Sequence, residues 1–124
     1  LTRIEAAGAR HGLRIGNVFH AGDGNIHPII LYDERDPAEV ARALAAGREI
    51  LVACLELGGS VTGEHGIGVE KMQELGLAFG PADLALMQRV RAVFDPEGRA
   101  NPGKIFPTPG GCVEQRAPRR QAAV

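Results

Sequence analysis

The sequence has no tryptophan, only 4% aromatic residues and only two cysteines among its 124 residues. Surfaces that bind nucleic acids rely on aromatic stacking and an excess of basic side chains, but here 14 basic residues are balanced by 15 acidic ones. We therefore expect no nucleic-acid partner and no polybasic membrane-binding surface. Two cysteines, Cys54 and Cys112, are too few to predict a disulfide framework, so a reducing, cytoplasmic setting is expected.

Long hydrophobic runs are also missing. No stretch approaches the roughly 20 apolar residues of a transmembrane helix, and the first residues lack the basic region and apolar core of a signal peptide. The chain opens at Leu1 in a helix-like segment, which we interpret as a piece cut from a longer polypeptide. The length suits a single domain with a modest core.

The hydrophobic pattern predicts an α+β fold in which an antiparallel hairpin packs with helices. A helix ending at Gly12 precedes two strand-like runs over 13–20 and 26–32; three helices are expected over 37–57, 69–75 and 81–94. The predicted buried face of the long helix consists of Val40, Leu44, Gly47, Leu51, Cys54 and Leu55, and that of the last helix of Leu84, Met87, Val90 and Phe94. The domain is expected to span 1–107, followed by a disordered tail over 108–124 that is rich in Pro, Gly and Arg.

Two boundary signals are specific. Asp36 is expected to cap the long helix, with Pro37 in its first turn and Glu39 reaching back to the cap. Asp23-Gly24 lies between the two strand-like runs and predicts a two-residue hairpin loop. That loop would place His20 directly opposite His27 on one face of the hairpin. Pro28 cannot donate a ladder hydrogen bond, so its strand should lie at an edge or be bulged.

Two glycine-rich stretches hold three of the four histidines, in His20-Ala-Gly-Asp-Gly-Asn-Ile-His27 and in Gly63-Glu64-His65-Gly66-Ile67-Gly68. One interpretation is that these are polar turn residues satisfied by backbone groups. The alternative is that His20, His27 and Glu64 form a three-ligand metal site with open positions for water or substrate. Zn²⁺, Mn²⁺ and Fe²⁺ all accept such ligands.

Glu64 and His65 are adjacent, so their side chains point in different directions and one can ligate while the other faces a reacting atom. A histidine beside a cation stays neutral near pH 7, which is the state that a general base requires. Asn101-Pro-Gly-Lys104 is either a plain turn or a cofactor contact, with Lys104 as a positive charge near a phosphate or an electron-rich ring. Asn25 is either a turn residue or an amide donor to a substrate oxygen.

Three strings carry a family resemblance: HAGDGNIHP, GGSVTGEHGIG and FDPEGRANPGKIF. Together, over about residues 13 to 107, they resemble the C-terminal part of the FAD-linked oxidases of the vanillyl-alcohol oxidase superfamily. Within it they look most like the branch of bacterial glycolate oxidase and D-lactate dehydrogenase. The resemblance implies the substrate (cap) domain, with a C-terminal helical segment that returns to the flavin domain.

The resemblance also implies roles for individual residues. His20, His27 and Glu64 would bind a divalent metal, and His65 would be the catalytic base that takes the substrate hydroxyl proton. Asn25 would lie near the substrate, and Asn101, with Lys104, near the FAD. The implied reaction is oxidation of a small 2-hydroxy acid, glycolate or D-lactate, to the 2-oxo acid by hydride transfer to FAD.

The FAD-binding domain of such enzymes is not contained in these residues, so we expect this chain to be inactive alone. The implied partners are subunits with a flavin-type domain and iron–sulfur clusters. The implied location is the cytoplasm, with peripheral attachment at the inner membrane through those subunits as the alternative. Two other functions stay open: a free-standing metal-binding module, and an assembly domain without redox activity.

Overall fold

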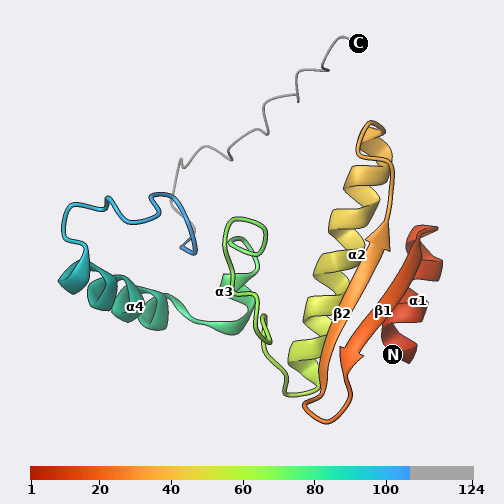
Figure 1. The fold of residues 1–124 in the computed structure, drawn as a ribbon, viewed down its shortest axis with the longest axis horizontal. Coiled ribbons are helices and arrows are strands. Elements are labelled where there is room, and N and C mark those ends of the chain that lie inside the picture. Colours follow the sequence, from red (N-terminus) through yellow and green to blue (C-terminus); the bar gives the residue numbers. More distant parts are fainter. Residues whose placement is uncertain (107–124) are drawn as a thin grey trace.

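The computed structural model describes residues 1–106; the predicted tail over 108–124 lies outside them. The elements are α1 (Thr2–His11), β1 (Arg14–His20), β2 (Asn25–Leu31), α2 (Pro37–Glu56), α3 (Leu75–Ala78) and α4 (Pro81–Phe94). Figure 1 shows the hairpin with α1 and α2 beside it as one unit, and α3 and α4 extending away from it. The predicted α+β class is confirmed.

The β1–β2 hairpin differs from the sequence prediction in its turn. His20 pairs with Asn25 and Val18 with His27, so four residues connect the strands instead of two. The Asp23 amide donates to the His20 carbonyl over 3.1 Å, and Gly24 alone of the central pair has a positive φ, of 68°. The two-residue turn would require a positive φ at Asp23 as well, whereas a longer loop leaves that residue in an ordinary conformation.

The register shift keeps both histidines on the same face. Side chains alternate along a strand, so only a shift by an odd number of residues would move one histidine to the other side. His20 and His27 are therefore diagonal neighbours on the face opposite to Ile15 and Ile30. Pro28 pairs with Asn17 in a continuous register without a bulge, and because the described sheet has two strands, each is an edge.

One glycine lets α1 lie close on the inner face of the hairpin. A Cβ at Gly8 of α1 would lie 3.0 Å from the Leu13 carbonyl and 3.2 Å from the Ile15 side chain, whereas one at Gly47 of α2 would lie at an ordinary contact distance of 3.9 Å from the Ile30 side chain. Gly12 ends α1 as predicted, with φ of 63°. The helices thus cover one face of the hairpin and leave the histidine face open.

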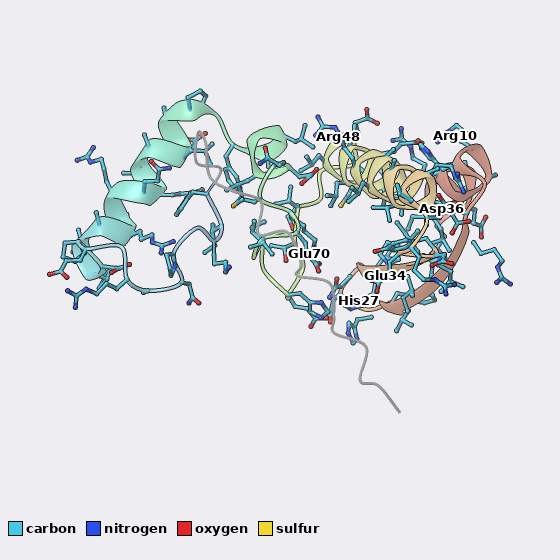
Figure 2. All side chains as sticks on the ribbon, turned by 90° about the horizontal axis from the view of Figure 1, so that it is seen from above. Arg10, His27, Glu34, Asp36, Arg48 and Glu70 are labelled. Carbon is cyan, nitrogen blue, oxygen red and sulfur yellow. The ribbon has the colours of Figure 1, made fainter. Side chains whose placement is uncertain are left out.

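Glu49 of α2 also ties the helices together. It accepts hydrogen bonds from Arg10 and, over 3.0 Å, interacts with His11 Nε2. The hydrogen bond from Arg10 and then that from His11 lower the pKa of Glu49. His11, the one histidine outside the two glycine-rich stretches, therefore serves the packing of α1 on α2. Figure 2 labels Arg10 beside this contact.

The start of α2 is confirmed, and its predicted face is half-buried except at Leu44, although the fully buried residues are alanines. Asp36 accepts from the Ala38 amide over 2.8 Å, while Glu39 reaches back to the Asp33 amide and not to Asp36. Leu44 is 70% exposed, and the buried residues of the helix are Ala43, Ala46 and Ala53. Small side chains bring α2 closer to its neighbours than the larger predicted ones would allow.

The C-terminal elements depart from prediction in two ways. The short helix lies at Leu75–Ala78 and not at 69–75, where the backbone makes turns. The bounds of α4 are as expected, but only part of its predicted apolar face is covered: Leu84 and Met87 are half-buried, whereas Val90 is 54% and Phe94 85% exposed. None of the helices described combines the length and the apolar character needed to cross a membrane.

Candidate metal and substrate site

Three side chains converge where the tip of the hairpin meets the loop after α2. One donor atom each from His20, His27 and Glu64 lies within 4.8 Å of the other two. His27 Nε2 is 2.8 Å and His20 Nε2 is 3.5 Å from the same atom, Glu64 Oε1. The structure therefore brings together the three predicted ligands, and Figure 2 shows His27 at the end of the hairpin beside this loop.

The hairpin register sets the geometry of the two imidazoles. As diagonal neighbours they have ring centroids 5.4 Å apart, with planes 84° to one another. Their edges can thus point toward one ion without stacking. The His27 side chain is 23% exposed and that of His20 is 54% exposed, so the site is open on one side.

The loop over 60–68 is held by local hydrogen bonds. Ser60 Oγ donates to the Thr62 carbonyl over 2.7 Å, and the Gly66 amide donates to Thr62 Oγ1 over 2.9 Å. Val61 is 3% exposed and anchors the start of the loop. Gly66 has a φ of 79°, a region that L-residues rarely adopt. This turn presents Glu64 and His65 to the hairpin.

His65 lies beside the three donors. Its Nε2 is 3.6 Å from Glu64 Oε1, and its ring centroid is 5.0 Å from that of His27. The side chain is 74% exposed, the most of the three histidines here. It can therefore reach a molecule bound over the site.

Asn25 lies against the same loop. Its side chain occupies the space beside the Gly63 Cα, where a Cβ would come within 2.4 Å of Asn25 Oδ1. Sequence reasoning considered Asn25 only as a turn residue or a substrate contact. This contact between the two glycine-rich stretches was missed, and no signal in a single sequence identifies it.

Asn101 and Lys104 lie in a separate turn, which Figure 1 shows beside α4 and away from the hairpin tip. Asn101 has a φ of 47° and Gly103 of 68°. The turn contacts the second glycine-rich stretch through the Ile105 amide, which donates to the Gly68 carbonyl over 2.8 Å. The structure thus connects this turn to the loop without placing it among the metal donors.

Arg91 and Asp95 of α4 hold that turn. The Arg91 guanidinium donates to the carbonyls of Ala100, Asn101 and Lys104. Asp95 accepts from the Arg99 and Ala100 amides over 2.8 and 3.0 Å. Burial raises the pKa of Asp95, but these amide hydrogen bonds and the Arg91 charge outweigh it and leave the pKa below its usual value. Sequence reasoning assigned neither residue a role.

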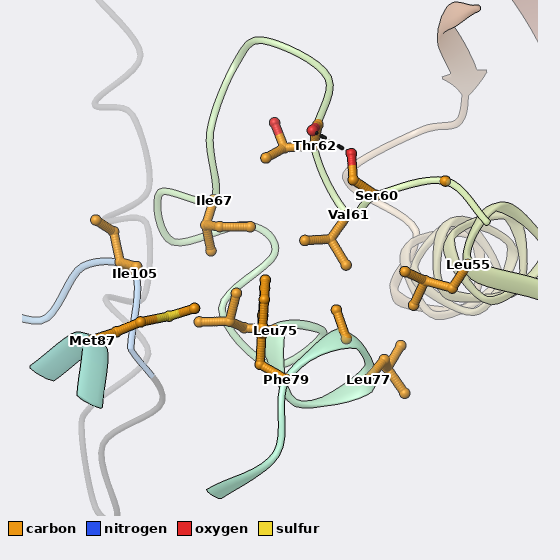
Figure 3. A pocket seen from close by; sticks show the side chains of 12 residues that line it. Leu55, Ser60, Val61, Thr62, Ile67, Leu75, Leu77, Phe79, Met87 and Ile105 are labelled. Carbon is orange, nitrogen blue, oxygen red and sulfur yellow. Dashed lines mark hydrogen bonds between the residues drawn. The ribbon is translucent and has the colours of Figure 1, made fainter. Parts of the chain in front are cut away.

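An apolar cavity of about 620 Å³ lies behind the loop. Figure 3 shows that side chains from the end of α2, the loop, α3 and α4 surround it; they include Leu55, Val61, Ile67, Leu75, Phe79 and Met87. Val61 and Ile67 flank the Glu64–Gly66 segment in the sequence. The loop therefore has an apolar anchor on each side of its polar tip.

Comparison with known proteins identifies the family of the chain. The family model described as "FAD linked oxidases, C-terminal domain" matches residues 1–105. The glycolate oxidase subunit GlcD of Escherichia coli K12 is 47% identical over 114 residues, which are 92% of this chain and 23% of that protein. GlcD of Bacillus subtilis is 39% identical, over 83% of this chain and 22% of that protein. The D-lactate dehydrogenase of Anaerostipes hadrus is 37% identical, over 85% of this chain and 22% of that protein.

The chain therefore spans less than a quarter of the length of these relatives. The family match covers all the candidate site residues, from His20 to Lys104. The chain belongs to the family of the FAD-linked oxidases, as a C-terminal domain.

Proposed function

We propose that this chain supplies the substrate side of the active site in a flavin-dependent oxidoreductase of small 2-hydroxy acids. The observation that carries the proposal is the convergence of His20, His27 and Glu64 donors within 4.8 Å. The names of the relatives, glycolate oxidase subunit and D-lactate dehydrogenase, make glycolate and D-lactate the candidate substrates. The product would be the 2-oxo acid.

The donor set fits a divalent ion. Two imidazole nitrogens and one carboxylate oxygen suit Zn²⁺, Mn²⁺ or Fe²⁺, and three protein ligands leave positions for the hydroxyl and carboxylate of a substrate. Such an ion, when bound, would polarise the substrate hydroxyl and lower its pKa. The hairpin would hold His20 and His27 in place, while the loop over 60–68 would provide Glu64.

His65 would act as the base. Its exposed imidazole would accept the hydroxyl proton at Nε2 as the C2–H bond breaks with its electron pair and the C2=O bond forms. FAD, when bound, would supply the acceptor for that hydride. Asn25 would border the substrate, and Asn101 and Lys104, held by Arg91, would face the cofactor.

The test uses a longer flavoprotein polypeptide that contains this sequence. His65→Ala should lower turnover of glycolate or D-lactate by about 10²-fold or more, with metal and flavin contents unchanged. Loss of metal in that variant would show that base and ligand are assigned the wrong way round. A polypeptide that carries the metal but no flavin would favour the metal-binding module instead.

The proposal extends to assembly and location. One relative is named as a subunit of glycolate oxidase, so we place this domain in a flavoprotein subunit that passes electrons to partner subunits with a flavin-type domain and iron–sulfur clusters. Its site would be cytoplasmic, with membrane attachment through those partners. We expect the 124-residue chain alone to be inactive because the flavin side of the site is not within it.

A further inference from the structure

The contact between Asn25 and Gly63 joins the hairpin to the loop at the metal donors. A Cβ at Gly63 would lie 2.4 Å from Asn25 Oδ1 and 2.8 Å from Asn25 Cγ. Such separations are far inside the optimal 3.5–4.0 Å or so for non-bonded carbon atoms. The backbone of Gly63 does not itself require glycine, because the glycines with positive φ in the described chain do not include it. The three atoms nearest to that position all belong to the Asn25 amide, so a methyl group at Gly63 would first have to displace this side chain.

Both partners of this contact neighbour a donor. Asn25 is the cross-strand partner of His20, and Gly63 immediately precedes Glu64. A displacement of the loop from the hairpin at this point would move Glu64 Oε1 away from His27 Nε2, with which it is now in contact at 2.8 Å.

We propose that Asn25 is a positioning residue: its amide, packed against Gly63, sets how closely the loop approaches the hairpin and so where Glu64 meets the two histidines. The inference rests on the proposed metal site. It gives Asn25 a role through shape, separate from any contact with substrate. Leucine branches at Cγ as asparagine does, so Asn25→Leu should preserve this role, whereas Asn25→Ala should not.

The experiment measures Zn²⁺ affinity of the full 124-residue chain by competition with a chromophoric chelator. Loss of a residue that orients a metal ligand costs about 10- to 100-fold in affinity, and this loss is expected for Gly63→Ala. In Asn25→Ala/Gly63→Ala the new methyl group occupies the space vacated by the amide. That double variant should therefore bind Zn²⁺ with an affinity within about threefold of that of Asn25→Ala. This difference is small against the loss of about 10- to 100-fold expected for Gly63→Ala. Asn25→Leu should bind like the unaltered chain.

Gly22→Ala is the matched control, because a Cβ there would meet no atom within 4 Å. Its Zn²⁺ affinity should be unchanged. If Gly63→Ala does not fold, the double variant decides: Zn²⁺ binding like that of Asn25→Ala supports the inference, and failure to fold overturns it. Unfolding of every metal-free variant, followed by circular dichroism, separates loss of fold from loss of affinity.

The positioning role would be overturned if the losses of Zn²⁺ affinity in Asn25→Ala and Gly63→Ala added in the double variant. It would also be overturned if Gly63→Ala bound Zn²⁺ with normal affinity. Both results would leave the proposed function intact. A wild-type chain that takes up no Zn²⁺ would overturn the metal site and, with it, the positioning role. The two failures are therefore distinguishable.

Discussion

Removal of the metal should destabilise the chain, because the three donors meet only in the folded state. His20 and His27 come from one hairpin, but Glu64 lies beyond the whole of α2. An ion that binds the native state alone, at 100 times its Kd, stabilises that state by about 2.7 kcal/mol. For a domain of this size each kcal/mol raises Tm by roughly 4 °C. We therefore expect Zn²⁺ to raise Tm by about 10 °C over the chelator-treated chain.

The assay is thermal unfolding followed by circular dichroism, with Zn²⁺ or with EDTA. His27→Ala and Glu64→Gln should abolish the Zn²⁺-dependent increase in Tm. His65→Ala should retain it, because a base contributes no ligand. His11→Ala is the matched histidine control, since His11 contacts Glu49 between α1 and α2 and lies outside the site.

Two results would refute this reasoning. An equal increase in Tm in Glu64→Gln and in the unaltered chain would show that Zn²⁺ binds elsewhere. Loss of the increase in His65→Ala, with the increase kept in Glu64→Gln, would exchange the roles of the two adjacent residues.

The remaining predictions concern the loop and the C-terminal turn. Gly66→Ala should lower the free energy of unfolding by about 1–2 kcal/mol, the cost of a left-handed conformation; urea unfolding checks this against Gly76→Ala, which meets no atom within 4 Å and has an ordinary φ. Asp95→Asn should destabilise the chain at pH 7, because the folded structure lowers the pKa of Asp95. The difference in stability should fade as the pH drops below the ordinary aspartate pKa of 3.8 and through the lowered folded pKa, which urea unfolding across pH would show. Arg91→Ala should release the Asn101–Lys104 turn, lowering flavin affinity of the longer polypeptide without changing Zn²⁺ affinity of this chain.

Local signals in the sequence predicted several helix boundaries. Gly12 ends α1 in a left-handed conformation, and Asp36 caps α2 with Pro37 in its first turn. Such signals depend on the backbone or side chain of a single residue, so no tertiary information is needed. The predicted ligands His20, His27 and Glu64 also lie together as expected.

Features set by tertiary packing were not predictable in the same way. Leu44 satisfies the helical periodicity but is exposed, because the close approach of α2 to its neighbours selects alanines such as Ala46 instead. The predicted register of the hairpin was wrong because the Asp23-Gly24 dipeptide alone does not reveal whether Asp23 adopts a positive φ. The Asn25–Gly63 contact joins segments on either side of α2 and has no local signature.

The register of the hairpin has a consequence for how the strands could slip past one another. A slip by two residues would leave both imidazoles on the open side of the sheet, as the observed and the expected registers both do. A slip by one residue would turn the imidazole of the slipped strand toward the helices. The two histidines therefore stay on one face only when the strands slip by an even number of residues.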